Sequence, residues 1–122
     1  DEILGAVVFD REAALQRVGG NTELLRDVGK IFFQEWEIQR EVLRECLAIR
    51  DREELSRVAH KIKGGAMNLS AEAVADVSGE LEVLGLQSEA GEADPVLRRL
   101  EDSVEAFRAE FHRDTEIQEV SA

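Results

Sequence analysis

Apolar residues recur along most of this chain at spacings of three and four, which is the pattern of amphipathic helices. The clearest case lies between residues 55 and 69. At about 100° per residue, its apolar side chains fall within roughly 60° of one direction. They are Leu55, Val58, Ala59, Ile62, Ala66 and Leu69. The pattern predicts a helix with one buried face and one face toward solvent.

Two helices are predicted before this segment. Asp10 is placed to cap a short helix to about residue 18, which Gly19 and Gly20 end. Asn21 or Thr22 starts a long helix to about residue 49. Its expected apolar stripe consists of Leu24, Val28, Ile31, Phe32, Leu43 and Leu47.

Start signals also mark the remaining helices. Asp51, with Glu54 three residues later, forms a start that resembles a capping box. Ser70 is the expected cap of the next helix, and Asp94 with Pro95 opens the last one as cap and first helical residue. The apolar positions of these two helices are Val74, Val77, Leu81 and Leu84, and then Leu97, Leu100, Val104, Phe107 and Phe111.

These elements predict an all-α fold, an antiparallel up-down four-helix bundle with a short additional N-terminal helix. A chain of 122 residues has room for one domain with a single core. We assign residues 1–9 to an N-terminal segment, 10–113 to the bundle and 114–122 to a C-terminal tail. Helical spacing places Phe32, Phe33, Phe107 and Phe111 in the core, whereas Trp36 fits either the core or an exposed patch beside the helix of residues 55–69.

Composition narrows the possible partners and the compartment. A net charge of −12 argues against sequence-independent binding to nucleic acid or to an anionic membrane. The single cysteine, Cys46, allows neither an internal disulfide nor a zinc site of several thiolates, which fits a reducing cytoplasm. No apolar run approaches the roughly 18 residues that span a bilayer. We therefore expect a cytoplasmic protein, or a domain of a larger, membrane-anchored kinase.

His60 is the residue with the most suggestive chemistry. It lies about 140° from the apolar centre of its helix, and Gly64 lies one turn later at about 180°. A neutral imidazole is both a nucleophile and a good leaving group, as a reversible phosphoryl carrier requires. A glycine inside a helix costs about 1 kcal/mol relative to alanine, which suggests that Gly64 keeps the surface bare for a partner, whereas Gly65 permits close helix packing. Lys63 is a helical neighbour whose ammonium can hold a phosphoryl group.

The residues around His60 resemble the signature of the histidine-containing phosphotransfer (Hpt) family, whose members accept a phosphoryl group from one receiver domain and pass it to another. The matching residues are Ala59-His60-x-Ile62-Lys63-Gly64 and Asn68-Leu69-x-Ala71. Similar segments extend over about residues 9–112, and they are Phe9-Asp10, Arg17-Val18-Gly19-Gly20-Asn21-x-Glu23-Leu24-Leu25 and Leu81-Glu82-x-Leu84-Gly85. Ser70 stands where the family usually has glycine.

The resemblance implies a phosphorelay in which His60 is the phosphoacceptor, through Nε2, and Lys63 stabilises the phosphoryl group. The expected docking residues are Gly64, Met67, Lys61, Arg57 and Ala71. The expected partners are response-regulator receiver domains and a sensor histidine kinase. Magnesium and most catalytic groups are expected on the receiver domain, so that this chain acts as a relay substrate, as a monomer, with no cofactor or metal of its own and no independent catalytic apparatus.

Basic residues gather near His60 in an otherwise acidic chain. They are Arg50, Arg52, Arg57, Lys61 and Lys63. They form either an attractive patch for the acidic phosphorylation pocket of a receiver domain or a solvated helix face of mixed charge.

Two alternatives to a relay protein remain open from the sequence. One is the phosphorylated domain of a chemotaxis-type histidine kinase, which receives its phosphate from ATP through a kinase domain. The other is a helical adaptor that is not phosphorylated. A dimetal carboxylate bundle is excluded because Arg57 and Ala109, rather than glutamates, precede His60 and His112 by three positions. No role is assigned to His112.

Overall fold

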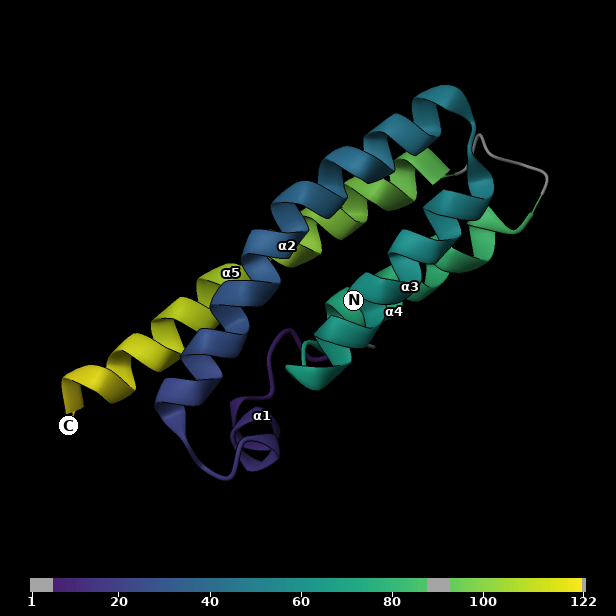
Figure 1. Ribbon diagram of the computed structural model, residues 1–122. Helices are drawn as coiled ribbons and strands as arrows, with labels where there is room; N and C mark the ends of the chain where they lie inside the picture. Colours follow the sequence, from purple (N-terminus) through teal and green to yellow (C-terminus); the bar gives the residue numbers. More distant parts are fainter. Residues whose placement is uncertain (1–5, 88–92, 122) are drawn as a thin grey trace.

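The computed structural model describes residues 6–87 and 93–121, with side chains described as far as residue 114. Within these residues the chain forms five helices and no strand. They are α1 (Arg11–Arg17), α2 (Thr22–Ile49), α3 (Arg52–Asn68), α4 (Glu72–Gly85) and α5 (Ala93–Ser121). Helices α2 to α5 alternate in direction, and α1 lies at the end of the bundle where α2 begins (Figure 1). The predicted fold, an up-down four-helix bundle with a short N-terminal helix, is confirmed.

The first three helices begin at the cap residues predicted for them. In each case the cap side chain accepts a hydrogen bond from the backbone N–H three residues later, at 3.1 Å for Asp10, 3.0 Å for Asn21 and 3.2 Å for Asp51. Gly19 and Gly20 adopt φ values of 64° and 79° between α1 and α2. Glycine reaches this left-handed region without steric cost, which explains why the pair ends α1.

The capping box predicted at the start of α3 is only half formed. Its cap, Asp51, is present, but the carboxylate of Glu54 binds the guanidinium of Arg57 instead of returning to the cap backbone. The backbone N–H of Asp51 donates to the carbonyl of Cys46 at 2.9 Å. That N–H is therefore already satisfied by the end of α2, so Glu54 is available to Arg57.

Ser70 does not cap α4, contrary to the sequence prediction. The N-cap position belongs to Ala71, which makes no side-chain cap bond. Ser70 instead adopts a left-handed conformation with φ 56°, and its carbonyl accepts a hydrogen bond from the backbone N–H of Asp10 at 3.0 Å. A turn of this shape favours glycine, which is the residue that the resembled family usually has here.

The last helix begins slightly earlier than predicted. Because α5 starts at Ala93, Asp94 lies in its first turn rather than at its cap, and Pro95 is its third residue. The first turn has backbone N–H groups without helical partners, so a proline is tolerated there. The backbone of α5 remains helical to Ser121, through most of the segment that we assigned to a C-terminal tail.

The core is built from the faces predicted for α3 and α5. Every apolar position named for these two helices is buried, as are the four phenylalanines assigned to the core. Trp36 is 1% exposed and belongs to the core. In α2, however, Leu24 and Ile31 are 44% and 54% exposed. Apolar residues occur on several sides of α2. Their spacing alone therefore assigns these two positions to the buried face incorrectly.

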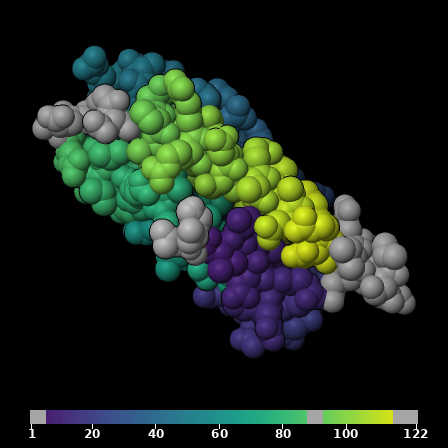
Figure 2. All heavy atoms as spheres, turned by 180° about the vertical axis from the view of Figure 1, so that it is seen from behind, coloured from purple at the N-terminus to yellow at the C-terminus, as the bar shows by residue number. Residues whose placement is uncertain are grey.

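The segment before α1 packs against α5 through aromatic rings. The ring centroid of Phe9 lies 5.5 Å from that of Phe107 and 5.3 Å from that of Phe111. In Figure 2 the purple N-terminal residues lie against the yellow part of α5. This contact, together with the bond between Asp10 and Ser70, holds α1 at the end of α3.

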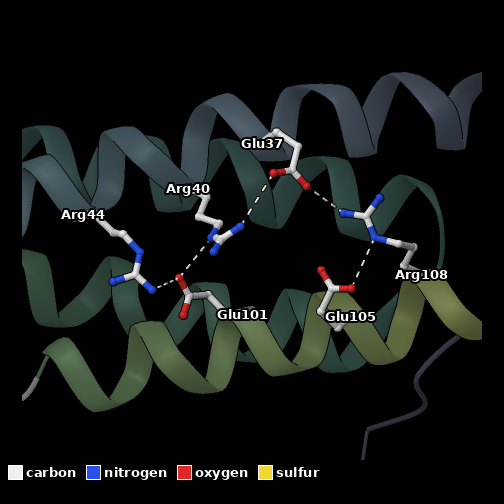
Figure 3. Close-up of polar contacts among 6 residues, drawn as sticks. All are labelled: Glu37, Arg40, Arg44, Glu101, Glu105 and Arg108. Carbon is white, nitrogen blue, oxygen red and sulfur yellow. Dashed lines mark hydrogen bonds and ion pairs between the residues drawn. The ribbon is translucent and has the colours of Figure 1, made fainter.

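Ion pairs connect α2 and α5 along the outside of the bundle (Figure 3). Glu101 accepts from Arg40 at 3.3 Å and from Arg44 at 2.6 Å, and Glu37 accepts from Arg108 at 3.0 Å. Such pairs at the surface contribute about 0 to 1 kcal/mol each. They align the two long helices, whereas the apolar core supplies most of the stability. None of the helices within the described residues is both long enough and apolar enough to cross a membrane.

Candidate functional site

Helix α3 presents His60 to solvent, as its sequence pattern predicts. The apolar face of the helix is buried against the rest of the bundle, with Ala59 and Ile62 at 0% and 1% exposure. The side chain of His60 points away from that face and is 65% exposed. A partner protein can therefore reach the imidazole directly.

The imidazole is held by a carboxylate from the neighbouring helix. Its Nδ1 lies 2.8 Å from Oε2 of Glu82 in α4. The other carboxylate oxygen, Oε1, lies 3.1 Å from Nζ of Lys63. Glu82 is 22% exposed, so it lies mostly beneath the two side chains that it joins. One carboxylate thus links the predicted phosphoacceptor, His60, to Lys63, the residue predicted to stabilise the phosphoryl group.

Close packing of α3 and α4 brings Glu82 to this place. The Ser56 hydroxyl donates to the backbone carbonyl of Glu82 at 2.9 Å. A Cβ added at Gly85, one turn later, would lie 3.0 Å from the backbone N of Ser56 and 3.0 Å from the carbonyl O of Arg52. A side chain at position 85 would push the backbone of α3 away by a few tenths of an ångström, so glycine favours this close approach of the two helices.

Burial alone would raise the pKa of Glu82, because the charged carboxylate loses solvent. The hydrogen bonds from Lys63 and His60 act more strongly in combination and lower that pKa below its usual value. Glu82 is therefore ionised at neutral pH and is a hydrogen-bond acceptor only. A neutral His60 then carries its proton on Nδ1, and the lone pair is on Nε2. Nε2 makes no hydrogen bond with any residue that the structure describes.

The two glycines after Lys63 have different surroundings. A Cβ added at Gly64 would meet no atom within 4 Å, which agrees with its predicted place on the bare surface near His60. A Cβ added at Gly65 would lie 3.2 Å from the Phe32 ring of α2. Gly65 thus allows close packing of α2 on α3, as predicted, and Gly64 leaves open space.

The remaining predicted docking residues do not all reach this surface. Met67 is 55% exposed, and Lys61 is exposed without an ion pair to any described residue. Arg57 is also exposed, but Glu54 binds its guanidinium through two hydrogen bonds of 2.8 and 2.6 Å. Ala71 is fully buried at 0% exposure. Ala71 is the N-cap residue of α4, and it offers no exposed surface to a partner.

Glu82 is the residue of this site that sequence reasoning missed. It lies 22 positions after His60 and on another helix, where the spacing rules for one helix do not apply. In the sequence, the segment Leu81-Glu82-x-Leu84-Gly85 stands out only by its resemblance to the family. The one feature that could have indicated Glu82 is its place between the apolar residues Leu81 and Val83, in a helix that packs on α3.

The described residues contain no group of three or more histidine, cysteine, aspartate or glutamate side chains placed to hold a metal ion. The site has one nucleophile, one cation and one carboxylate, arranged on the surface. A neutral imidazole with its lone pair toward solvent is a nucleophile that can bind a substituent on nitrogen and release it again.

The family model described as Hpt domain matches residues 27–110 of this chain. The match includes α3 and α4 with His60, Lys63 and Glu82, and most of α2 and α5. Searches among curated proteins and among solved structures gave no match.

Proposed function

Since this chain belongs to the Hpt domain family, we propose that it relays a phosphoryl group between receiver-domain aspartates through His60 in a two-component phosphorelay. The observation that carries this proposal is the pairing of an exposed imidazole with Glu82, which supports an Nδ1–H tautomer and leaves Nε2 toward solvent. The proposed site of action is the cytoplasm, with a sensor histidine kinase upstream of the first receiver domain.

The proposed step is a reversible exchange of one bond for another. The lone pair of His60 Nε2 attacks the phosphorus of an aspartyl phosphate, an N–P bond forms, and the O–P bond breaks. The aspartate leaves as a free carboxylate. The proton on Nδ1 stays in its hydrogen bond to Glu82, whose negative charge offsets the positive charge that develops on the imidazole. The reverse step transfers the group to the aspartate of a second receiver domain.

Lys63 has the position and charge to act on the phosphoryl oxygens. Its side chain is 33% exposed, and its ammonium is held 3.1 Å from Oε1 of Glu82, one helical turn from His60. A phosphoryl group on Nε2 offers three acceptor oxygens, to which an ammonium binds more strongly than a neutral donor does. We infer that Lys63 turns from Glu82 toward the phosphoryl group when transfer occurs.

The proposed docking surface consists of Gly64, Met67, Lys61 and Arg57, around His60. Gly64 lets a partner approach closely, Met67 offers apolar contact area, and Lys61 is a cation free to meet the acidic phosphorylation pocket of a receiver domain. Magnesium belongs to that receiver pocket in this proposal, and this chain supplies none of its ligands.

The experiment follows transfer of a labelled phosphoryl group from a panel of phosphorylated receiver domains. The native chain should gain an acid-labile, alkali-stable label, and His60→Gln should not. His112→Gln is the matched control, since it removes the other histidine and should be labelled like the native chain. Label on His60→Gln, or no label on the native chain from any donor, would refute the proposal. Labelling only by ATP and a kinase domain would favour the chemotaxis-type alternative.

A further inference from the structure

A groove of about 440 Å³ lies beside the phosphoacceptor site, where α1 meets the end of α3 and the start of α4. Six residues of its lining matter for the argument that follows. They are Ala13 and Arg17 from α1, Lys63 and Met67 from α3, and Ala75 and Asp76 from α4. Figure 1 shows the three helix ends that meet here. The groove shares Lys63 and Met67 with the surface around His60 and is continuous with it.

Small apolar side chains and charged side chains share the lining of the groove. The carboxylates of Asp10 and Glu72, which also line it, already accept hydrogen bonds from the backbone N–H groups of Ala13 and Val7. Ala75 is 8% exposed, and Met67 is 55% exposed. Arg17 on the α1 wall and Asp76 on the α4 wall are exposed, and neither forms a hydrogen bond or ion pair with another described residue. These two charges are free for a partner, whereas the ammonium of Lys63 is already bound to Glu82.

The distance from His60 decides whether a docked partner reaches the groove. Met67 follows His60 by seven residues, which is about 10 Å along a helix. A specific interface of ordinary size buries about 800 Å² on each partner, which corresponds to a disc of roughly 16 Å radius. A receiver domain centred on His60 with an interface of that size therefore reaches the groove at Lys63 and Met67.

We propose that this groove is a specificity pocket for the receiver domain, an inference that rests on the proposed function. It accepts one apolar side chain from the receiver surface, between a basic group that meets Asp76 and an acidic group that meets Arg17. Charges of opposite sign on facing walls discriminate between partners, because a receiver with the reversed arrangement places like charges together. The pocket thus selects which receivers dock, and it takes no part in the transfer step.

The first test fills the groove. In Ala13→Leu, added methyl groups occupy the space for the partner side chain, while Ala48→Leu makes the same change at an exposed position of α2. With the fastest donor of the receiver panel, Ala13→Leu should lower the second-order transfer rate by about tenfold, the effect of losing one well-packed interface contact. Its single-turnover rate at saturating receiver should stay within about twofold of the native rate. Ala48→Leu should match the native chain in both.

The second test reverses one wall charge. Asp76→Lys should change the order in which the receivers of the panel react, with donors that place an acidic group at this wall gaining most. Asp27→Lys, the same charge change at an exposed position of α2, controls for the general effect of net charge on association rates. It should shift all receivers by a similar factor and leave their order unchanged.

The outcomes separate this inference from the proposed function. If the native chain is labelled and both groove variants transfer like their controls with every receiver, the specificity pocket is refuted and the relay stands. The specificity pocket is also refuted if Ala13→Leu lowers only the single-turnover rate at saturating receiver. That result would assign the groove to the transfer step rather than to docking. If the native chain is never labelled, both proposals fail together.

Discussion

Glu82 binds the imidazole of His60 through one carboxylate oxygen and the ammonium of Lys63 through the other. At the scale of single residues, this shared contact determines which imidazole nitrogen faces a partner. It also keeps the ammonium near the place where phosphate charge would arrive. Glu82 is thus a positioning residue in our account, because it acts through His60 and Lys63 and does not itself meet the phosphoryl group.

Removal of Glu82 should therefore change the tautomer of His60. In Glu82→Ala the Nδ1–H form loses its acceptor, so ¹⁵N chemical shifts of the His60 ring should move toward the Nε2–H form. Phosphotransfer should slow by roughly tenfold or more, as is typical when a partner that orients a reacting group is lost. In Glu82→Gln the amide oxygen can still accept a hydrogen bond from Nδ1. This variant should therefore keep more of the Nδ1–H tautomer and more of the phosphotransfer rate than Glu82→Ala does. Unchanged ring shifts in Glu82→Ala would contradict the positioning role.

The ionised form of Glu82 should also make stability depend on pH. Its pKa in the folded protein is lower than its ordinary value of 4.5, so the unfolded chain takes up this proton first on acidification. The ionised Glu82 therefore adds to the free energy of unfolding above about pH 4.5. This stabilisation is lost as the pH falls through the pKa of Glu82 in the folded protein. Relative to Glu82→Gln, the native chain should be more stable by about 0.5 to 1 kcal/mol at pH 7.

The measurement for this pH effect is denaturant unfolding followed by emission of Trp36, the only tryptophan, which is 1% exposed. The difference between the native chain and Glu82→Gln should shrink toward zero at pH 3. A difference that stays constant between pH 7 and pH 3 would mean that the charge of Glu82 is not its source.

At the scale of secondary-structure elements, α3 carries two adjacent glycines, one on its exposed surface and one packed against α2. Their effects on stability should differ, because Gly65 faces the Phe32 ring at 3.2 Å and Gly64 faces no atom within 4 Å. Gly65 is thus needed for the packing of α2 on α3, whereas the fold does not require a glycine at position 64.

Gly64→Ala should make the protein more stable by up to about 1 kcal/mol, because alanine is the better helix former and the new methyl group meets nothing. It should nevertheless slow phosphotransfer, because the new methyl group stands where the proposed receiver domain approaches His60. Gly65→Ala is the matched control, with little gain or a loss of stability. Chemical denaturation and transfer rates measured on the same samples test this. Faster or unchanged transfer in Gly64→Ala would show that the bare surface has no role in docking.

Helix positions and caps could be predicted well because they depend on local spacing. Asp10, Asn21 and Asp51 cap their helices as the sequence indicates, and the apolar face of α3 is buried as expected. Ser70 shows where local rules fail. Serine is a good cap by type, but the bond from Asp10 to its carbonyl is a tertiary contact that the sequence does not display.

At the scale of the whole molecule, α2 and α5 form a long pair whose approach depends on one small residue. A Cβ added at Gly29 of α2 would lie 2.1 Å from Cζ of Phe111. The Phe111 ring also contacts Phe9, Phe33 and Phe107, so it has little freedom to move. Gly29 thus lets an aromatic cluster join α5, α2 and the segment before α1.

Gly29→Ala should therefore destabilise the protein by about 1 kcal/mol or more. The cost of overpacking, typically about 1 to 3 kcal/mol, exceeds the gain of about 1 kcal/mol in helix propensity. Denaturant unfolding followed through Trp36 emission measures the loss of stability. Gly64→Ala is the control, because the same substitution there should make the protein more stable. A more stable Gly29→Ala would show that the ring of Phe111 yields easily.

Features that depend on how separate helices pack could not be predicted from the sequence. His60, Lys63 and Gly64 lie on one helix and were found from its periodicity and family-like pattern. Glu82 and the groove between α1, α3 and α4 arise only when separate helices pack. The exposed Leu24 was misplaced for the same reason, since the buried face of α2 depends on which helices cover it.

The central claim is that His60 accepts a phosphoryl group on Nε2 while Glu82 holds Nδ1. The most direct measurement is ³¹P–¹⁵N correlation NMR of the chain with ¹⁵N-labelled histidine, recorded after phosphorylation by the fastest receiver donor. We predict a phosphorus signal coupled to Nε2 of His60 and absent in His60→Gln. Coupling to Nδ1, or to a nitrogen of His112, would contradict the account.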